Sequence, residues 1–285
     1  MEFTAEAVES FLGLTQPGKE NEFWITFDGH IGSGYGIPEQ PVVIKKSRPN
    51  DSECLELKAQ FENELKLKSI NHTNIVKLVG YAESDTHFYL VYEKIQGRTI
   101  DQMIEGQISW KGAIKILTGI ASAIRYLQEH PNGPWVHCGL CLSNIVVNEN
   151  GSPKLLEFRY CVALGERKIG GYEGFKHREE NGLASLGTDV FSFGVLGVLL
   201  LTKDSKTSFV NKDGAQEPIT NLYLDQWRRT LSILPTQFRN PKEAIHISKV
   251  IVGCLHKEKL PPIKDIHTQL RELLLLDSLC PLGCD

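Results

Sequence analysis

Residues that could do chemistry gather in two neighbouring stretches of this chain. Residues 137–147 read HCGLCLSNIVV, and residues 154–159 read KLLEFR, shortly after an Asn-Gly turn. The amide of Asn144 and the carboxylate of Glu157 offer the oxygen ligands that Mg²⁺ takes in proteins. These two stretches hold the main candidate functional residues of the chain.

The same stretches resemble the catalytic loop and metal-binding motif of protein kinases, H-R-D-L-x-x-x-N and D-F-G. His137 and Asn144 stand seven positions apart, as in that frame (144 − 137 = 7). The resemblance places Gly139 at the catalytic-base aspartate, Glu157 at the metal-binding aspartate and Arg159 at the glycine. The frame is present, while the residues that would perform the chemistry differ.

Further stretches resemble kinases in the correct order. PVVIK at 41–45 is similar to the V-A-I-K strand, which implies that Lys45 is the phosphate-binding lysine. HTNIVKLVGY at 72–81 resembles the plant receptor-like kinase (interleukin-receptor-associated-kinase-like) group. In that group a tyrosine is typical at the gatekeeper position, where Tyr92 falls. DVFSFGV at 189–195 resembles the start of the buried central helix of the C-lobe.

The resemblance implies an α+β, bilobal protein-kinase-like fold. It has a small antiparallel β-sheet N-lobe with one main helix, and a mostly helical C-lobe. The corresponding divisions are an N-terminal helix and linker, the kinase-like N-lobe, the kinase-like C-lobe and a C-terminal tail, at 1–22, 23–96, 97–276 and 277–285.

Hydrophobic periodicity predicts the elements that position these residues. The predicted strands are 23–27, 31–37, 42–46 and 88–93, with turns at Asp28-Gly29 and at 38–41. The predicted helices are 4–14, 52–68, 110–127, 221–232, 241–256 and 262–276. Thr4 is the expected N-cap of the first helix.

The position of a phosphate-binding glycine loop depends on its distance from Lys45. Two strands of ~5–6 residues and a ~4-residue hairpin need roughly 16 residues. This places Gly29 at the third loop glycine (45 − 29 = 16), with Trp24 and Thr26 at the first two. A loop that opens at Gly32 leaves only 13 residues (45 − 32 = 13). We therefore favour Gly29, and interpret GSGYG at 32–36 as a flexible strand and hairpin.

The expected partner of Lys45 is a carboxylate on the helix at 52–68. Counting from Phe61 in an F-x-x-E frame gives Glu64, whereas counting back from His72 gives Asn63. We favour Glu64. In the alternative, the acidic residues of this helix form a solvated face and Lys45 has no partner.

Several substitutions weaken the chemistry that the resemblance implies. Gly139 cannot accept a proton, and a general base contributes about 10²–10⁴-fold. Cys138 replaces the arginine of the loop, while Asn144 is retained. Glu157 extends its carboxylate by ~1.5 Å relative to aspartate. Arg159 removes easy access to positive φ, and its guanidinium could pair with Glu157 at the metal position.

The segment that follows also departs from the family. From Arg159 to Ala184 it contains no serine or threonine, only Tyr160 and Tyr172. It has no A-P-E, and Leu260 replaces the arginine that would pair with it. Because both ends of a buried ion pair are missing together, no charge is stranded.

Composition and charge restrict the class of protein. The 285 residues carry a net charge of −4, which offers no footprint for nucleic acid. The longest apolar run, 190–201, is shorter than the ~20 residues that span a bilayer. Seven cysteines in a large chain fit a reducing compartment. We expect a cytoplasmic protein, or one that reaches the plasma membrane through a partner.

Together these features predict a pseudokinase that acts as a protein-interaction or allosteric platform in plant receptor-kinase or immune signalling. Expected partners are active receptor-like kinases or immune receptors. No cofactor is expected, and weak ATP binding with or without Mg²⁺ stays open. The alternative is an atypical Ser/Thr kinase with residual phosphotransfer. The degenerate nucleotide positions are Lys45, Glu64, Tyr92, Asn144 and Glu157, of which Asn144 and Glu157 are the degenerate metal candidates.

Some features have more than one interpretation. Cys138 and Cys141 have the C-x-x-C spacing of a redox dithiol or half a zinc site, but their kinase-like context favours coincidence. Cys280 and Cys284 have no recognisable partner spacing. The polar stretches at 165–180 and 203–217 are candidate surfaces or solvated loops. The chain is either complete or part of a longer receptor or tandem kinase.

Overall fold

The protein is described by a computed structural model, and its chain divides into two compact units. The first comprises Met1–Gln96 with Leu156–Arg159, and the second Gly97–Leu155 with Tyr160–Asp285. No helix among the described residues is long and apolar enough to cross a membrane. The described residues are 1–13, 16–49, 54–106, 108–168, 170–172, 174–175, 182–211, 213–230, 232–234, 241–256 and 259–279.

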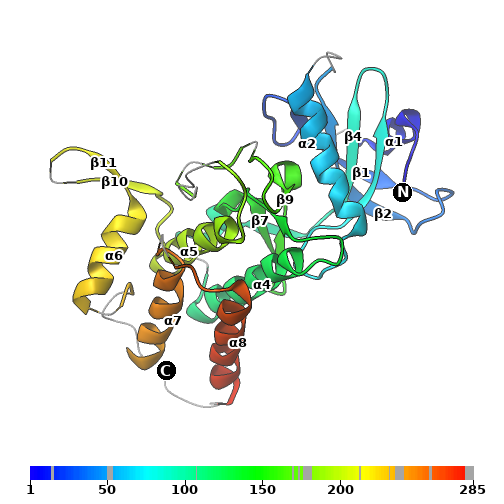
Figure 1. Cartoon of the computed structure of the whole chain (residues 1–285). Coiled ribbons are helices and arrows are strands. Elements are labelled where there is room, and N and C mark those ends of the chain that lie inside the picture. The colour runs from blue at the N-terminus through cyan, green and yellow to red at the C-terminus, as the bar shows by residue number, and fades with distance from the viewer. Residues whose placement is uncertain are drawn as a thin grey trace. The chain divides into compact units, whose positions relative to one another are not determined.

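The first unit is a four-stranded antiparallel sheet with a helix on each face. The strand order is β1-β2-β4-β3, and Figure 1 shows these strands between α1 and α2. The strands are β1 Trp24–Ile31, β2 Gln40–Ser47, β3 Leu78–Glu83 and β4 Phe88–Glu93. The helices are α1 Ala5–Phe11 and α2 Leu55–Leu65, with the 3₁₀ turns η1 Lys66–Ser69 and η3 Phe158–Tyr160.

Strand β2 has functional residues on both of its faces, because successive side chains of a strand point to opposite sides. Ile44 lies in the apolar cluster that contains Val8 and Phe11 of α1. Lys45, the next residue, points the other way and pairs with Glu64 of α2. The sheet therefore separates an apolar layer under α1 from a charged site under α2.

The predicted strands at 23–27 and 42–46 correspond to β1 and β2, but the turn and the strand predicted between them are wrong. Residues 24–31 form one continuous strand, and β1 pairs with β2 from Trp24↔Ser47 to Ile31↔Gln40. The predicted strand at 31–37 is the connection between them, and no turn occurs at Asp28-Gly29. Gly29 lies within β1, and α1 crosses so closely there that a Cβ at this position would lie 2.6 Å from the carbonyl oxygen of Phe11.

The second unit is mainly helical. Its helices are α3 Ile100–Met103, α4 Trp110–Gln128, α5 Leu186–Thr202, α6 Ile219–Thr230, α7 Pro241–Gly253 and α8 Ile263–Leu279, with the 3₁₀ turn η2 Leu142–Asn144. Its strands are β5 Gly97–Thr99, β6 Trp135–Val136, β7 Ile145–Asn148, β8 Pro153–Leu155, β9 Val162–Ala163, β10 Ser208–Val210 and β11 Gln216–Pro218. Buried α5 packs against α4 and α7, and α4 packs against α8.

The predicted fold class is confirmed, and most helix predictions are close to the observed bounds. The helix predicted at 110–127 is α4, and the buried central helix is α5. The first helix has Thr4 as its N-cap, whose hydroxyl accepts from the Ala7 N–H at 3.2 Å, but it ends at Phe11. The predicted helix start at Ser52 lies outside the described residues, as does most of the predicted tail at 277–285.

The position of Gly29 predicts which glycine of this region tolerates a side chain. Gly29→Ala should lower the free energy of unfolding by about 1–3 kcal/mol, because its methyl group would meet the Phe11 carbonyl and the Ile44 side chain. Gly32→Ala is the matched control, since no atom lies within 4 Å of its Cβ position. Thermal and denaturant melts of the two variants check this. Equal melts would contradict the close approach of the Phe11 carbonyl to Gly29.

Candidate functional site

Lys45 of β2 and Glu64 of α2 form an ion pair inside the first unit. Lys45 Nζ lies 2.7 Å from Glu64 Oε1, and both side chains are buried. Glu62 is exposed. Asn63 instead donates from Nδ2 to the backbone carbonyl of Arg159 at 3.0 Å. Of the two partners that the sequence left open for Lys45, the structure selects Glu64.

Glu157 and Arg159 extend this pair into a group of four alternating charges. Glu157 Oε2 lies 3.1 Å from Lys45 Nζ and 2.8 Å from Arg159 Nη2. The pairing of Arg159 with Glu157 that the sequence suggested is therefore present. We call Lys45, Glu64, Glu157 and Arg159 the four-charge cluster. Two cations face two carboxylates, so the ionised cluster has no net charge.

The second carboxylate oxygen of Glu64 joins the cluster to the rest of the unit. Glu64 Oε2 accepts from the Tyr92 hydroxyl at 2.7 Å and from the Phe158 N–H at 3.2 Å. Burial and the Glu64 carboxylate raise the pKa of Tyr92 well above its ordinary value, so its hydroxyl keeps the proton that it donates. Glu64 thus connects β2, β4 and the segment around Phe158.

Trp24 also borders the Lys45 ammonium. Its indole is 1% exposed, and its Nε1–H donates to Gln60 Oε1 at 3.1 Å. Lys45 Nζ lies 5.7 Å from the centroid of the Trp24 ring and 6.0 Å from that of Tyr92, within the range of cation–π attraction. Lys45 therefore has two carboxylates and two aromatic rings as neighbours.

The charges of the cluster reinforce one another. Burial acts to raise the pKa of Glu157, but the Lys45 ammonium and the Arg159 guanidinium outweigh it and lower the pKa to about 2. Burial acts to lower the pKa of Lys45, and the carboxylates of Glu157 and Glu64 outweigh it, so that this pKa is raised. Both groups are charged throughout the neutral range.

Two non-glycine residues of the predicted site have a left-handed backbone. Glu157 has φ 64° and Cys138 has φ 57°. Such a conformation costs on the order of 1–3 kcal/mol and persists only where the surroundings hold it. At Glu157 the ion pairs with Lys45 and Arg159 stabilise this backbone conformation.

In the second unit, Asp189 holds the loop that contains Cys138. Its Oδ2 accepts from the His137 N–H at 2.7 Å, and its Oδ1 accepts from the Cys138 N–H at 2.9 Å. The Gly139 N–H donates to His137 Nδ1 at 3.2 Å, and Asn144 Nδ2 donates to the Gly139 carbonyl at 2.8 Å. The amide of Asn144 thus binds the loop itself.

The two cysteines of this loop are present as thiols. Cys138 and Cys141 are both buried, and the Cys141 sulfur lies 3.3 Å from the Ser143 hydroxyl. Among the residues that the structure describes, no group of three or more His, Cys, Asp or Glu side chains is placed to hold a metal ion. Cys280 and Cys284 lie outside the described residues.

Comparison with known proteins decides the family. The family model for the protein kinase domain matches residues 34–260. The chain belongs to the protein kinase family. The predicted resemblance to plant receptor-like kinases is confirmed by its relatives in Arabidopsis thaliana.

Two of these relatives are much longer than the chain. It is 25% identical over 282 residues to cysteine-rich receptor-like protein kinase 27, and 30% identical over 235 residues to L-type lectin-domain containing receptor kinase IX.1, both from Arabidopsis thaliana. The matches cover 91% and 78% of this chain, but only 42% and 35% of the relatives. The chain therefore spans less than half the length of these relatives.

The cluster does not fit the Mg²⁺ that accompanies ATP in kinases. Mg²⁺ needs oxygen ligands in near-octahedral geometry at about 2.0–2.1 Å. Glu157, at the metal-binding position of the kinase frame, already holds Lys45 and Arg159 on one carboxylate oxygen. Gly139, at the base position, has no side chain that could accept a proton. The Lys45 ammonium and the Arg159 guanidinium therefore compete with a metal ion for the Glu157 carboxylate.

The start of the kinase domain has no glycine loop at the predicted position. Trp24, Thr26 and Gly29 all lie in β1, so their assignment to loop glycines is wrong. The chain reverses just before β1, where Asn21 Oδ1 accepts from the N–H groups of Phe23 and Trp24, both at 2.9 Å. An asparagine that bonds its own backbone is a turn signal, and it was available in the sequence.

Aromatic side chains pack closely in the described part of the segment that follows Arg159. The Tyr160 and Tyr172 rings meet edge to face at 5.9 Å. Phe175 is buried, and its carbonyl accepts from the Ser192 hydroxyl at 2.7 Å. Glu173 and residues 176–181 lie outside the described residues. The described part of this segment is anchored to α5 through Phe175.

The depressed pKa of Glu157 predicts a pH-dependent stability of the first unit. Because its pKa of about 2 lies below the ordinary 4.5, its stabilisation is complete above about pH 4.5 and is lost as the pH falls through about 2. Its size is on the order of 3 kcal/mol. Urea melts between pH 7 and pH 2 should show that Glu157→Gln removes this part of the acid sensitivity. An unchanged pH profile in this variant would contradict the ion pairs.

The role of Asp189 predicts a large loss of stability when its carboxylate is removed. Asp189→Ala leaves two buried N–H groups without an acceptor, and each costs about 1–3 kcal/mol. Asp225→Ala is the matched control, because Asp225 forms an exposed pair with Arg228. Chemical denaturation should show a large change for the first variant and a change within about 0.5 kcal/mol for the second.

Proposed function

We propose that this member of the protein kinase family is a catalytically impaired pseudokinase. It acts as a protein-interaction or allosteric platform in plant receptor-kinase or immune signalling. The four-charge cluster carries the proposal. Lys45, which would bind the phosphates of ATP, pairs with Glu64 and Glu157. Glu157, which would bind the metal, pairs with Lys45 and Arg159. The expected partners are active receptor-like kinases or immune receptors.

The chemistry of phosphoryl transfer explains why this arrangement matters. Kinases accelerate transfer mainly by positioning the phosphates and neutralising their charge, and they use an aspartate to accept the proton of the substrate hydroxyl. Here Glu157, at the metal position, is already neutralised by Lys45 and Arg159. Gly139 offers no proton acceptor. No cofactor is required for such a platform, and the cytoplasm or the inner face of the plasma membrane is its proposed place of action.

One observation favours a second function. The Lys45–Glu64 pair, which positions phosphates in active kinases, is intact at 2.7 Å. An atypical Ser/Thr kinase with weak ATP binding and residual phosphotransfer could use this pair if nucleotide displaced Arg159. The two functions differ in whether Mg²⁺ and ATP bind to the native chain.

Thermal shifts with ATP and Mg²⁺ distinguish them. A ligand at 100 times its Kd adds about 2.7 kcal/mol of stability, so tight binding is visible as a higher Tm. We expect no Mg²⁺-dependent shift for the native chain at millimolar ATP, and a shift for Arg159→Ala, whose Glu157 is released. Arg48→Ala, which removes an exposed arginine of the same unit, is the control. Tight Mg²⁺-dependent binding by the native chain would contradict the proposal.

A phosphotransfer assay completes the test. The native chain is incubated with radiolabelled ATP, alone and with a generic protein substrate, beside Lys45→Ala. We expect no difference between the two. Phosphate incorporation that is lost in Lys45→Ala would establish the atypical kinase instead.

A further inference from the structure

The N-terminal residues lie on the sheet of the first unit as a separate short ligand would. Val8 and Phe11 of α1 are buried against an apolar face, while the rest of the helix is largely exposed. We call this face of the sheet, on the side opposite Lys45, the α1 face. It is lined by Ile31, Val42, Ile44, Ala82, Tyr89 and Val91.

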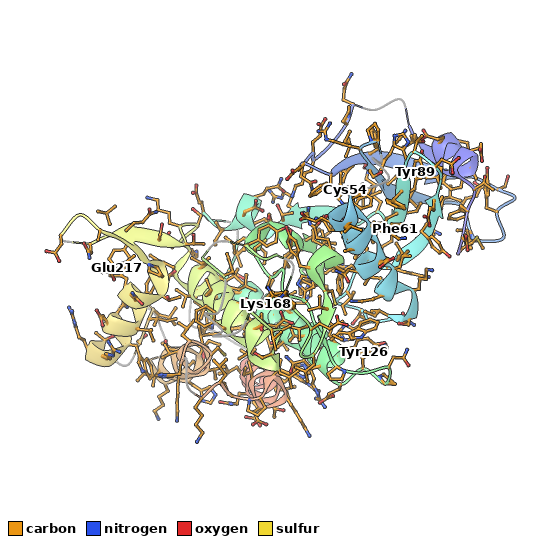
Figure 2. All side chains as sticks on the ribbon, turned by 45° about the horizontal axis from the view of Figure 1, so that its top comes forward. Cys54, Phe61, Tyr89, Tyr126, Lys168 and Glu217 are labelled. Carbon is orange, nitrogen blue, oxygen red and sulfur yellow. The ribbon has the colours of Figure 1, made fainter. Side chains whose placement is uncertain are left out.

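The α1 face also binds a carboxylate. Glu9 Oε1 lies 2.6 Å from Lys46 Nζ and accepts from the Tyr89 hydroxyl at 2.6 Å. Burial and the Glu9 carboxylate raise the pKa of Tyr89, so this hydroxyl remains a donor. Figure 2 shows Tyr89 beside α1, whereas Phe61 lies on α2. The face therefore recognises an acid placed between two apolar anchors.

The residues before α1 pair with the edge of the sheet. The Phe3 N–H donates to the Tyr81 carbonyl at 2.8 Å, and the Tyr81 N–H donates to the Met1 carbonyl at 3.0 Å, as in a parallel strand. Phe3 packs edge to face on Phe11 at 5.2 Å. A Cβ at Gly80 would collide with the Phe3 ring, so this glycine makes room for it. The edge of β3 accepts an extended segment followed by a helix.

These contacts are specific, but a helix of this length has little stability of its own. α1 has 7 residues, and isolated helices shorter than ~12–15 residues are marginal in water. Its helical form therefore depends on the α1 face. Because α1 brings little helical stability of its own, a separate helix with the same side chains could make the same contacts with the α1 face.

We propose that the α1 face is a docking surface for a short amphipathic helix of a partner protein, and that α1 occupies it when no partner is bound. The fitting helix carries an aliphatic residue and, three positions later, an aromatic one, as Val8 and Phe11 do. A carboxylate follows the aliphatic residue directly, in the place of Glu9, and an extended aromatic segment precedes the helix. This inference adds a partner class to the proposed platform and rests on that function. Its test involves no nucleotide, so the two can fail separately.

The test uses the full chain with a specific protease site between Gln16 and Pro17. After cleavage, a fluorescent peptide with the sequence of residues 1–13 is added, and its anisotropy and the melt of the protein are recorded. The peptide should exchange into the folded protein, and Phe11→Ala or Glu9→Lys in the peptide should weaken binding by about tenfold or more.

A charge swap makes the result specific. Lys46→Glu in the protein should restore binding of the Glu9→Lys peptide, because the pair is re-formed with reversed charges. Arg48→Glu, which changes an exposed ion pair with Glu20 and touches no residue of the peptide, should leave binding unchanged. The proposal is overturned if the cleaved protein unfolds, if the native fragment stays bound and never exchanges, or if the folded protein ignores the peptide.

Discussion

A buried lysine between two glutamates organises the first unit. Taking ions out of water costs several kcal/mol each, and only close partners and further hydrogen bonds offset that cost. Lys45, Glu64, Glu157 and Arg159 satisfy this condition together, and Tyr92 and the Phe158 N–H complete Glu64. Removing any one charge would strand another. The segment Leu156–Arg159 consequently belongs to this unit, although its neighbours in sequence belong to the second.

Because side chains alternate along β2, this strand carries two ion pairs on opposite faces of the sheet. Lys45 and Lys46 are adjacent in sequence, yet each pairs with a glutamate from a helix on its own side of the sheet, Glu64 or Glu9. Between them lies one strand whose backbone is paired on both edges, with β1 and β4. A shift of β2 that disturbed one pair would displace the other, so the α1 face and the four-charge cluster share a single rigid support.

Local patterns in the sequence were enough for the fold class, for α4, for the strand β4 and for the place of Lys45. Local patterns failed where a contact between residues far apart in the sequence determines the structure. GSGYG at 32–36 alternates like a strand, but β1 continues through Asp28-Gly29 because 24–31 pairs with 40–47, and the glycine there makes room for the Phe11 carbonyl. The choice between Asn63 and Glu64 is similar. Both are buried, and only the position of Arg159, almost a hundred residues away, shows that Asn63 holds a carbonyl and Glu64 an ammonium.

The loop at 137–144 explains how chemical residues can be lost without loss of shape. Asp189 binds the N–H groups of His137 and Cys138, and Asn144 binds the carbonyl of Gly139. All these contacts are made to backbone groups at 137, 138 and 139. They therefore do not depend on which residue types stand at 138 and 139. A catalytic aspartate could be replaced by Gly139 at little cost to the fold, because the loop is held by Asp189 from outside. The side chains that do hold structure, Asp189, Lys45 and Glu64, are the ones that remain. This division supports the proposal that the protein acts as a binding platform, because the contacts that shape the loop do not depend on a catalytic side chain.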